Sequence, residues 1–149
     1  MRAILQRVTR AEVRVESDTI GKIGRGLLVL LGVGQDDAEH DARYLVEKIV
    51  GLRIFNDEAG QMNLSLAETG GALLVVSQFT LYGDVRRGRR PGWSEAAKPE
   101  RAKELYEFFI GEAQSRVSFV ATGAFQRMMD VELVNDGPVT ILIDSKKLF

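Results

Sequence analysis

Three polar side chains that follow an apolar run are the residues best placed to do chemistry in this sequence. The aliphatic run Leu73–Val76 predicts a strand buried on both faces, and Ser77, Gln78 and Thr80 come directly after it. Both hydroxyls can face one pocket only if the strand ends or bends after Gln78, because side chains alternate along a regular strand. Such a bend would also free backbone N–H groups, which can stabilise the oxyanion formed when an ester is cleaved. The alternative is that both hydroxyls bond to neighbours within an ordinary strand.

A second candidate is a turn near the C-terminus, between two apolar runs. Its sequence, Asn135-Asp-Gly-Pro138, has the composition of a plain turn, and a proline at the start of a strand costs no ladder hydrogen bond. Backbone carbonyls at Gly137 and Pro138 could hold an ammonium group, and the Gly–Pro bond could be trans or cis. Taken alone, the turn could equally be a simple connection.

A third candidate is a cluster of arginines in the long irregular segment 83–98. Guanidinium groups match phosphate geometry, and glycine and proline beside them let a loop follow an irregular backbone. The net charge of −1 gives no global basic field, so a nucleic acid would have to be bound locally. The alternative is a solvated loop. The arginines are Arg86, Arg87, Arg89 and Arg90.

Composition narrows the chemistry. The chain has no cysteine and one histidine, which excludes disulfides, thiolate nucleophiles and multi-histidine metal sites, so we expect no metal and no cofactor. A Ser-His-Asp triad would need His40, which we interpret as a solvated residue in the first turn of a helix. Thr80 therefore has no obvious general base, and a threonine hydroxyl without one is a poor nucleophile. Two mechanisms remain open: attack by Thr80, or attack by water with backbone N–H groups holding the oxyanion.

The 149 residues, 45% of them hydrophobic, predict one globular domain spanning residues 1–149. No apolar run approaches the roughly 20 residues of a spanning helix, and the N-terminus lacks the features of a signal peptide. We therefore expect a cytoplasmic protein without a membrane partner.

Two helices and several strands must position these candidates. Apolar spacing predicts helices at about 37–50 and 99–114, the first with a capping box formed by Asp36 and Glu39. Strands clustered around two helices favour an α+β fold with a mainly antiparallel, barrel-like sheet and two packed helices. Strands are predicted within residues 2–15, 20–23, 27–33, 52–55, 73–76, 117–120, 129–134 and 139–143, and turns at 56–60 and 68–71.

The motifs together resemble the D-aminoacyl-tRNA deacylases of the D-tyrosyl-tRNA deacylase type. The resemblance rests on Ser77-Gln-Phe-Thr-Leu81, on the arginine-rich loop that leads into Pro91-Gly-Trp-Ser-Glu-Ala-Ala97, and on Asn135-Asp-Gly-Pro-Val-Thr140. It covers essentially the whole chain, including the opening Met1–Val8. One departure is Gly92-Trp93, where the family more commonly has Ser-Phe. This change bears on the packing of the loop.

The resemblance implies a homodimeric hydrolase that cleaves the ester between a D-amino acid, or glycine, and the terminal adenosine of tRNA. It implies that the pocket of one subunit receives a cis Gly–Pro turn from the partner, which reads the chiral centre, and that the RNA 2′-hydroxyl assists attack by water. The implied roles are Ser77, Gln78, Phe79 and Thr80 in the catalytic pocket, Gly137 and Pro138 in chiral selection, Phe125 and Met129 near the adenosine, and Arg7 as a brace for the turn.

Two other functions compete with this interpretation. A non-catalytic RNA-binding module associated with translation would use the arginine loop and leave Ser77–Thr80 structural. A serine hydrolase of small esters is disfavoured by the single histidine.

Overall fold

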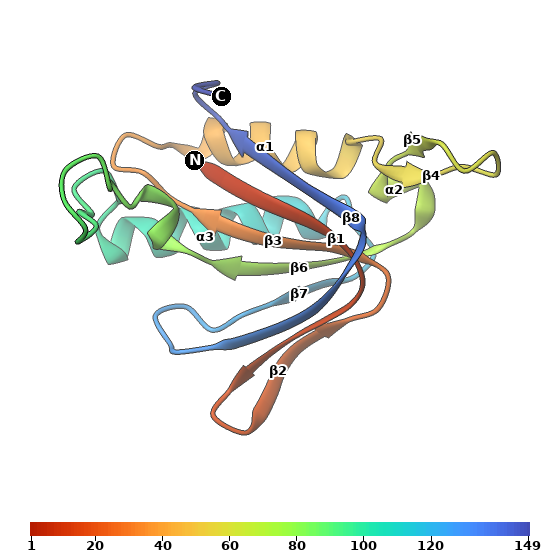
Figure 1. The fold of residues 1–149 in the computed structure, drawn as a ribbon, viewed down its shortest axis with the longest axis horizontal. Coiled ribbons are helices and arrows are strands. Elements are labelled where there is room, and N and C mark those ends of the chain that lie inside the picture. The colour runs from red at the N-terminus through yellow and green to blue at the C-terminus, as the bar shows by residue number, and fades with distance from the viewer.

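A strongly curved β-sheet, with helices packed on one face, forms the core of the computed structural model, which describes residues 1–149 (Figure 1). The strand order is β2-β1-β3-β6-β7, and β8 also pairs with β1, which lets the sheet curl toward a barrel. None of the helices combines the length and apolar character that crossing a bilayer requires. The strands are β1 Arg2–Val15, β2 Asp18–Ile23, β3 Gly26–Gly32, β4 Phe55–Asn56, β5 Met62–Leu64, β6 Ala72–Ser77, β7 Val120–Thr122 and β8 Asp130–Asp144, and the helices are α1 Glu39–Gly51, α2 Leu66–Thr69, the 3₁₀ turn η1 Phe79–Tyr82 and α3 Pro99–Gln114.

The predicted α+β class with a barrel-like sheet and packed helices is confirmed, but the sheet is mixed. Strand β1 pairs antiparallel with β2, β3 and β8, whereas β3 pairs parallel with β6, and β6 with β7. Parallel neighbours need a long crossover connection, usually helical. Helices α1 and α3 lie in the two crossovers, which is why both cover the same region of the sheet.

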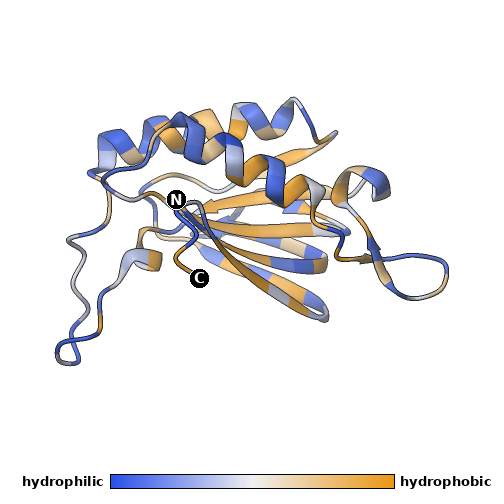
Figure 2. Ribbon diagram, turned by 90° about the horizontal axis from the view of Figure 1, so that it is seen from above, coloured by the Kyte–Doolittle hydropathy of each residue, from blue (hydrophilic) through white to orange (hydrophobic).

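The central strands are buried on both faces, as the apolar run predicted. Leu73 and Val75 of β6 face the larger core, which the sheet forms with α1 and α3. Leu74 and Val76 face a smaller core enclosed by the curl of the sheet. The central strands, β3 and β6, are almost continuously hydrophobic and lie under the helices (Figure 2). Strand β6 is therefore a rigid support for whatever follows Ser77.

The expected capping box of the first helix was wrong. Helix α1 begins at Glu39, and its N-cap is Ala38, whose N–H donates to the Asp41 carboxylate over 2.9 Å. Burial opposes ionisation of Asp41, but hydrogen bonds from Ala38, Ser145 and Lys146 outweigh it and lower its pKa to about 2. Residue His40 lies in the first turn with 75% of its side chain exposed, in agreement with the interpretation of a solvated residue.

Several shorter elements differ from the prediction. The turn predicted at 68–71 overlaps the one-turn helix α2, which begins with a reciprocal capping box between Ser65 and Glu68. The strand predicted at 52–55 is only β4, which pairs with the unpredicted β5. The two strands predicted near the C-terminus are one strand, β8, whose pairing with β1 shifts register around Arg7. Irregular register interrupts the alternation of side chains, so the sequence pattern resembles two strands.

Candidate active site

The chain bends where β6 ends. The N–H of Gln78 makes the last hydrogen bond to β3, with the Leu31 carbonyl at 2.8 Å, and residues from Phe79 then form η1. The first N–H groups of a helical turn have no partner within it. No loop carbonyl or side chain accepts from the N–H of Phe79 or Thr80, and both residues are exposed. The bend therefore presents two backbone donors at the end of a rigid strand.

The side chains at the bend contain no base. The amide of Gln78 donates to the hydroxyl of Thr80, and no carboxylate, histidine or lysine bonds to that hydroxyl. An amide cannot remove a proton from threonine, because its nitrogen is a donor and its oxygen is only weakly basic. Thr80 has no activating partner in this chain.

A cavity of about 670 Å³ opens beside the bend, between β6, the loop before α3 and the segment before β8. It brings together Ser77, Gln78 and Phe79 with two residues from far along the chain, Phe125 and Met129. Most of its lining is apolar. An apolar hollow with a few polar groups at one end is the usual form of a small-molecule site.

Trp93 lines the cavity, a role beyond the loop packing that its sequence position suggested. Its ring meets that of Phe79 edge to face, with centroids 5.1 Å apart, and both rings line the cavity. Both remain partly exposed, at 41% for Trp93 and 56% for Phe79. An aromatic residue in an otherwise glycine- and proline-rich loop was the available signal. The pair gives the pocket an apolar wall beside the bend.

The Gly137–Pro138 turn lies within β8, where the pairing with β1 is irregular. Its peptide bond is cis, Gly137 has φ of 128°, and both residues are exposed. The buried Arg7 side chain holds the turn: its Nε donates to the Asp136 carbonyl over 3.1 Å, and its Nη1 donates to the Ile54 carbonyl over 2.6 Å. Arg7 thus contacts the turn and stands outside the cavity.

The turn is too far from the cavity for one chain to join them. Arg7, beside the turn, pairs with Leu27 of β3, which pairs with Leu73 of β6, four residues before Ser77. From β8 to β6 there are three strand spacings, about 14 Å, and four residues along β6 add about 13 Å. The predicted site residues therefore form two groups in each chain.

The arginine loop is exposed, but its four arginines are not equivalent. Arg86 forms a two-pronged contact with Asp84, with Nε–Oδ1 and Nη2–Oδ2 distances of 2.9 and 2.8 Å. This guanidinium holds the pKa of Asp84 at about 2. The other three, Arg87, Arg89 and Arg90, make no ion pair. The guanidinium groups of these three are free to meet phosphates, and that of Arg86 is 83% exposed beside its partner Asp84.

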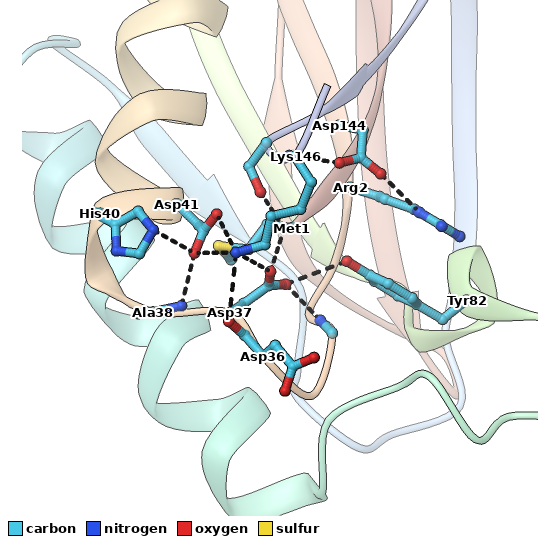
Figure 3. Close-up of polar contacts among 12 residues, drawn as sticks. Met1, Arg2, Asp36, Asp37, Ala38, His40, Asp41, Tyr82, Asp144 and Lys146 are labelled. Atoms are coloured by element: carbon cyan, nitrogen blue, oxygen red, sulfur yellow. Dashed lines mark hydrogen bonds and ion pairs between the residues drawn. The ribbon is translucent and has the colours of Figure 1, made fainter. Parts of the chain in front are cut away.

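A buried cluster of polar residues anchors η1 through Tyr82 and Leu81 (Figure 3). The carboxylate of Asp37 accepts from the Tyr82 hydroxyl over 3.2 Å and from the Gly34 N–H over 2.6 Å, and it lies 2.7 Å from the N-terminal ammonium of Met1. Arg2 donates to the Leu81 carbonyl over 3.0 Å. Burial and the nearby Asp37 charge raise the pKa of Tyr82, which keeps its hydroxyl a donor. Two residues of η1 are thus tied to the N-terminus and to the loop after β3.

Comparison with known proteins decides the family. The family model described as D-Tyr-tRNA(Tyr) deacylase matches residues 4–144. This chain belongs to that family. The match confirms the resemblance that the motifs indicated.

Relatives agree with the family assignment over the full chain, and solved structures share its fold. It is 65% identical to the D-aminoacyl-tRNA deacylase of Koribacter versatilis (strain Ellin345) and 60% identical to that of Thermosipho africanus (strain TCF52B), with all of each chain covered. A solved structure titled c-Myc DNA Unwinding Element Binding Protein superposes with a TM-score of 0.92 at 39% identity, covering 97% of this chain and 98% of the other. A probable eukaryotic D-amino acid tRNA deacylase, 19% identical, shares the fold with a TM-score of 0.85 over 95% and 97% of the two chains.

The support beneath η1 predicts a large effect of Asp37→Asn on stability. Met1 is 0% exposed and Asp37 3%, so removal of the carboxylate charge leaves the buried ammonium with the Ser145 hydroxyl as a partner but without its ion pair. Breaking such a pair typically costs about 3–5 kcal/mol of unfolding free energy. Urea unfolding at one protein concentration measures it. The neighbouring exposed Asp36 supplies the control, since Asp36→Asn should change stability by less than about 0.5 kcal/mol. Equal stabilities of the two variants would contradict this view of Asp37.

Proposed function

We propose that this protein hydrolyses the ester bond of D-aminoacyl-tRNA, and of glycyl-tRNA, releasing the free amino acid and tRNA while sparing L-aminoacyl-tRNA. Family membership and the names of relatives about 60% identical support this activity. The observation that carries it is the bend after β6, where the N–H groups of Phe79, which lines the cavity, and of the next residue, Thr80, have no partner. Thr80 itself is not among the residues that line the cavity. Donors of this kind are what an ester's developing oxyanion requires.

In the proposed reaction, water attacks the ester carbon and the two N–H groups bind the oxyanion. No side chain of this chain can take the proton from Thr80, so the attacking group is water, and the 2′-hydroxyl of the terminal ribose assists. Ser77 and Gln78 line the pocket and orient the ester. Phe125 and Met129, which line the same cavity, contact the terminal adenosine.

The Gly137–Pro138 turn of a second copy completes the proposed site. Within one chain the turn lies more than two strand spacings from the cavity, so only another chain can bring the two groups together. Carbonyls of the turn would hold the substrate's ammonium group while the N–H groups hold its carbonyl. The side chain then has one direction left, which is open for a D-residue and blocked by the turn for an L-residue. Glycine has no side chain to reject.

Contact with the body of the tRNA is assigned to the arginine loop. Arg87, Arg89 and Arg90 are exposed, carry no ion pair and lie in the loop that leads to Trp93 in the cavity wall. Their guanidinium groups can bind phosphates beside the site. Arg86 shapes the loop through Asp84 and contributes less.

A chiral assay tests the function. Purified protein should release tyrosine from D-Tyr-tRNA, and L-Tyr-tRNA should persist under the same conditions, because the turn blocks the L side chain. The measurement is the fraction of ester left with time for each substrate. Similar rates on both would overturn chiral selection. Tight binding of tRNA without turnover of any aminoacyl ester would instead favour the non-catalytic RNA-binding module.

Replacement of Thr80 separates the two mechanisms. Thr80→Ala keeps the backbone N–H that binds the oxyanion, so kcat for D-Tyr-tRNA should fall by less than about tenfold, well short of the roughly 10²–10³-fold typical for loss of one oxyanion donor. Single-turnover rates measure the effect, and Ser77→Ala is the matched control for loss of a hydroxyl in the same segment. Activity at the level of uncatalysed hydrolysis in Thr80→Ala alone would restore Thr80 as the nucleophile.

Mixed dimers test the two-chain site. Ser77→Phe fills the pocket, and Gly137→Val places a branched side chain where φ is 128° and where even a Cβ atom would lie 2.8 Å from Val139. Each variant alone should be inactive. When the two are refolded together, half of the dimers combine them and hold one intact site, so about a quarter of wild-type activity should return in a symmetric dimer. If each chain held a complete site, mixing would restore nothing.

A further inference from the structure

A second hollow, of about 500 Å³, adjoins the proposed active site. It lies between one side of α3 and the segment that follows β7. Three residues line both this hollow and the main cavity: Tyr106, Phe125 and Gln126. The Tyr106 and Phe125 rings pack with centroids 5.7 Å apart, so the two hollows meet at this aromatic pair.

Under the proposed function, only the last nucleotide of tRNA enters the main cavity, and its base is assigned to Phe125 and Met129. The second hollow shares Phe125 with that cavity. The nucleotide that precedes the terminal adenosine can therefore reach the second hollow.

The lining of the hollow suits a nucleotide. Seven of its ten residues are not hydrophobic, in contrast to the apolar main cavity. The amides of Gln114 and Gln126 can donate to and accept from a base edge, and the carboxylate of Glu107 can accept from an exocyclic amino group. Lys103, at the rim, is paired with Glu107 at 3.7 Å and provides a cation for the connecting phosphate. The partly exposed ring of Phe125 supplies a surface against which a base can stack, whereas the Tyr106 ring that packs on it is buried.

The wall of the hollow contains a glycine, Gly111, with free space beside it. Gly111 lies in the last part of α3 and lines the hollow, and a Cβ atom built on it would meet no atom within 4 Å. Glycine is unfavourable in a helix relative to alanine, and packing does not require it at this position. A larger side chain at position 111 would extend into the hollow without disturbing the core.

We propose that this second hollow binds the nucleotide that precedes the terminal adenosine of the tRNA, with Glu107, Gln114 and Gln126 on its base and Lys103 on its phosphate. The proposal rests on the proposed function, because it assumes that aminoacylated RNA enters the main cavity. It adds a subsite that recognises RNA and takes no part in cleaving the ester.

Two substrates, of which only one has a nucleotide before the terminal adenosine, test the subsite. D-Tyr-tRNA fills both hollows, whereas D-tyrosyl-adenosine, an ester on a single nucleoside, fills only the main cavity. Gly111→Phe should lower kcat/KM for D-Tyr-tRNA by about 5- to 150-fold, the range that corresponds to loss of one stacked base. It should leave kcat/KM for D-tyrosyl-adenosine within about twofold of wild type. Gly111→Ala, which leaves the hollow open, should match wild type on both substrates.

The other outcomes each decide a question. An equal loss on both substrates, or no loss on either, would overturn the subsite. If Gly111→Phe fails to fold, the double variant Lys103→Ala, Gln114→Ala replaces it, because both residues are exposed on α3. It too should lower kcat/KM for D-Tyr-tRNA and leave that for D-tyrosyl-adenosine unchanged. If the wild type hydrolyses neither substrate, the proposed function fails. The affinity of each variant for uncharged tRNA is then measured. If the subsite exists, Gly111→Phe should bind this tRNA more weakly than Gly111→Ala does.

Discussion

Burial of β3 and β6 on both faces is the constraint on which the rest of the structure depends. Alternate side chains of each strand enter two different cores, so both strands must lie inside the sheet with cover on each side. Strand β3 pairs parallel with β6, and β6 with β7, so the chain crosses the same face twice, through α1 and then through α3, and the ends of β3 and β6 lie at one edge of the sheet. The loop after β3 and the turn after β6 are therefore neighbours, although about 45 residues separate them.

The polar cluster at that edge follows from this arrangement. Asp37, in the loop after β3, bonds to Tyr82 at the end of η1 and to the N-terminal ammonium at the start of β1 (Figure 3). A buried carboxylate is stable only with such partners, and every partner here belongs to a different segment. The cluster thus fixes the turn that exposes the N–H groups of Phe79 and Thr80. In a chain with no cysteine and one exposed histidine, a backbone held in this way is the available means of stabilising an oxyanion.

Much of this arrangement was predictable from sequence, and the predictions that failed did so for identifiable physical reasons. The apolar run before Ser77 predicted a strand buried on both faces, and the spacing in 99–114 predicted α3, because both patterns record burial directly. The capping box at Asp36 failed because α1 begins only at Glu39, where the Asp41 carboxylate, held by Lys146 from the far end of the chain, accepts from the N–H of Ala38. The role of Trp93 in the cavity wall and the pairing of Arg86 with Asp84 also depend on how the loop folds back, which residue types alone do not record.

The separation of the two motif groups is the feature that most limits how the protein can work. The turn at Gly137 is anchored by the buried Arg7, and the bend at Phe79 is anchored by Asp37, so neither can move far without loss of buried contacts. A site that needs both groups cannot form by rearrangement within one chain, and it can form between two chains related by a two-fold axis. Such an axis applies the same contact twice, so one dimer would contain two sites. Each site would then join two rigid elements, and selection by a clash with the turn requires that rigidity.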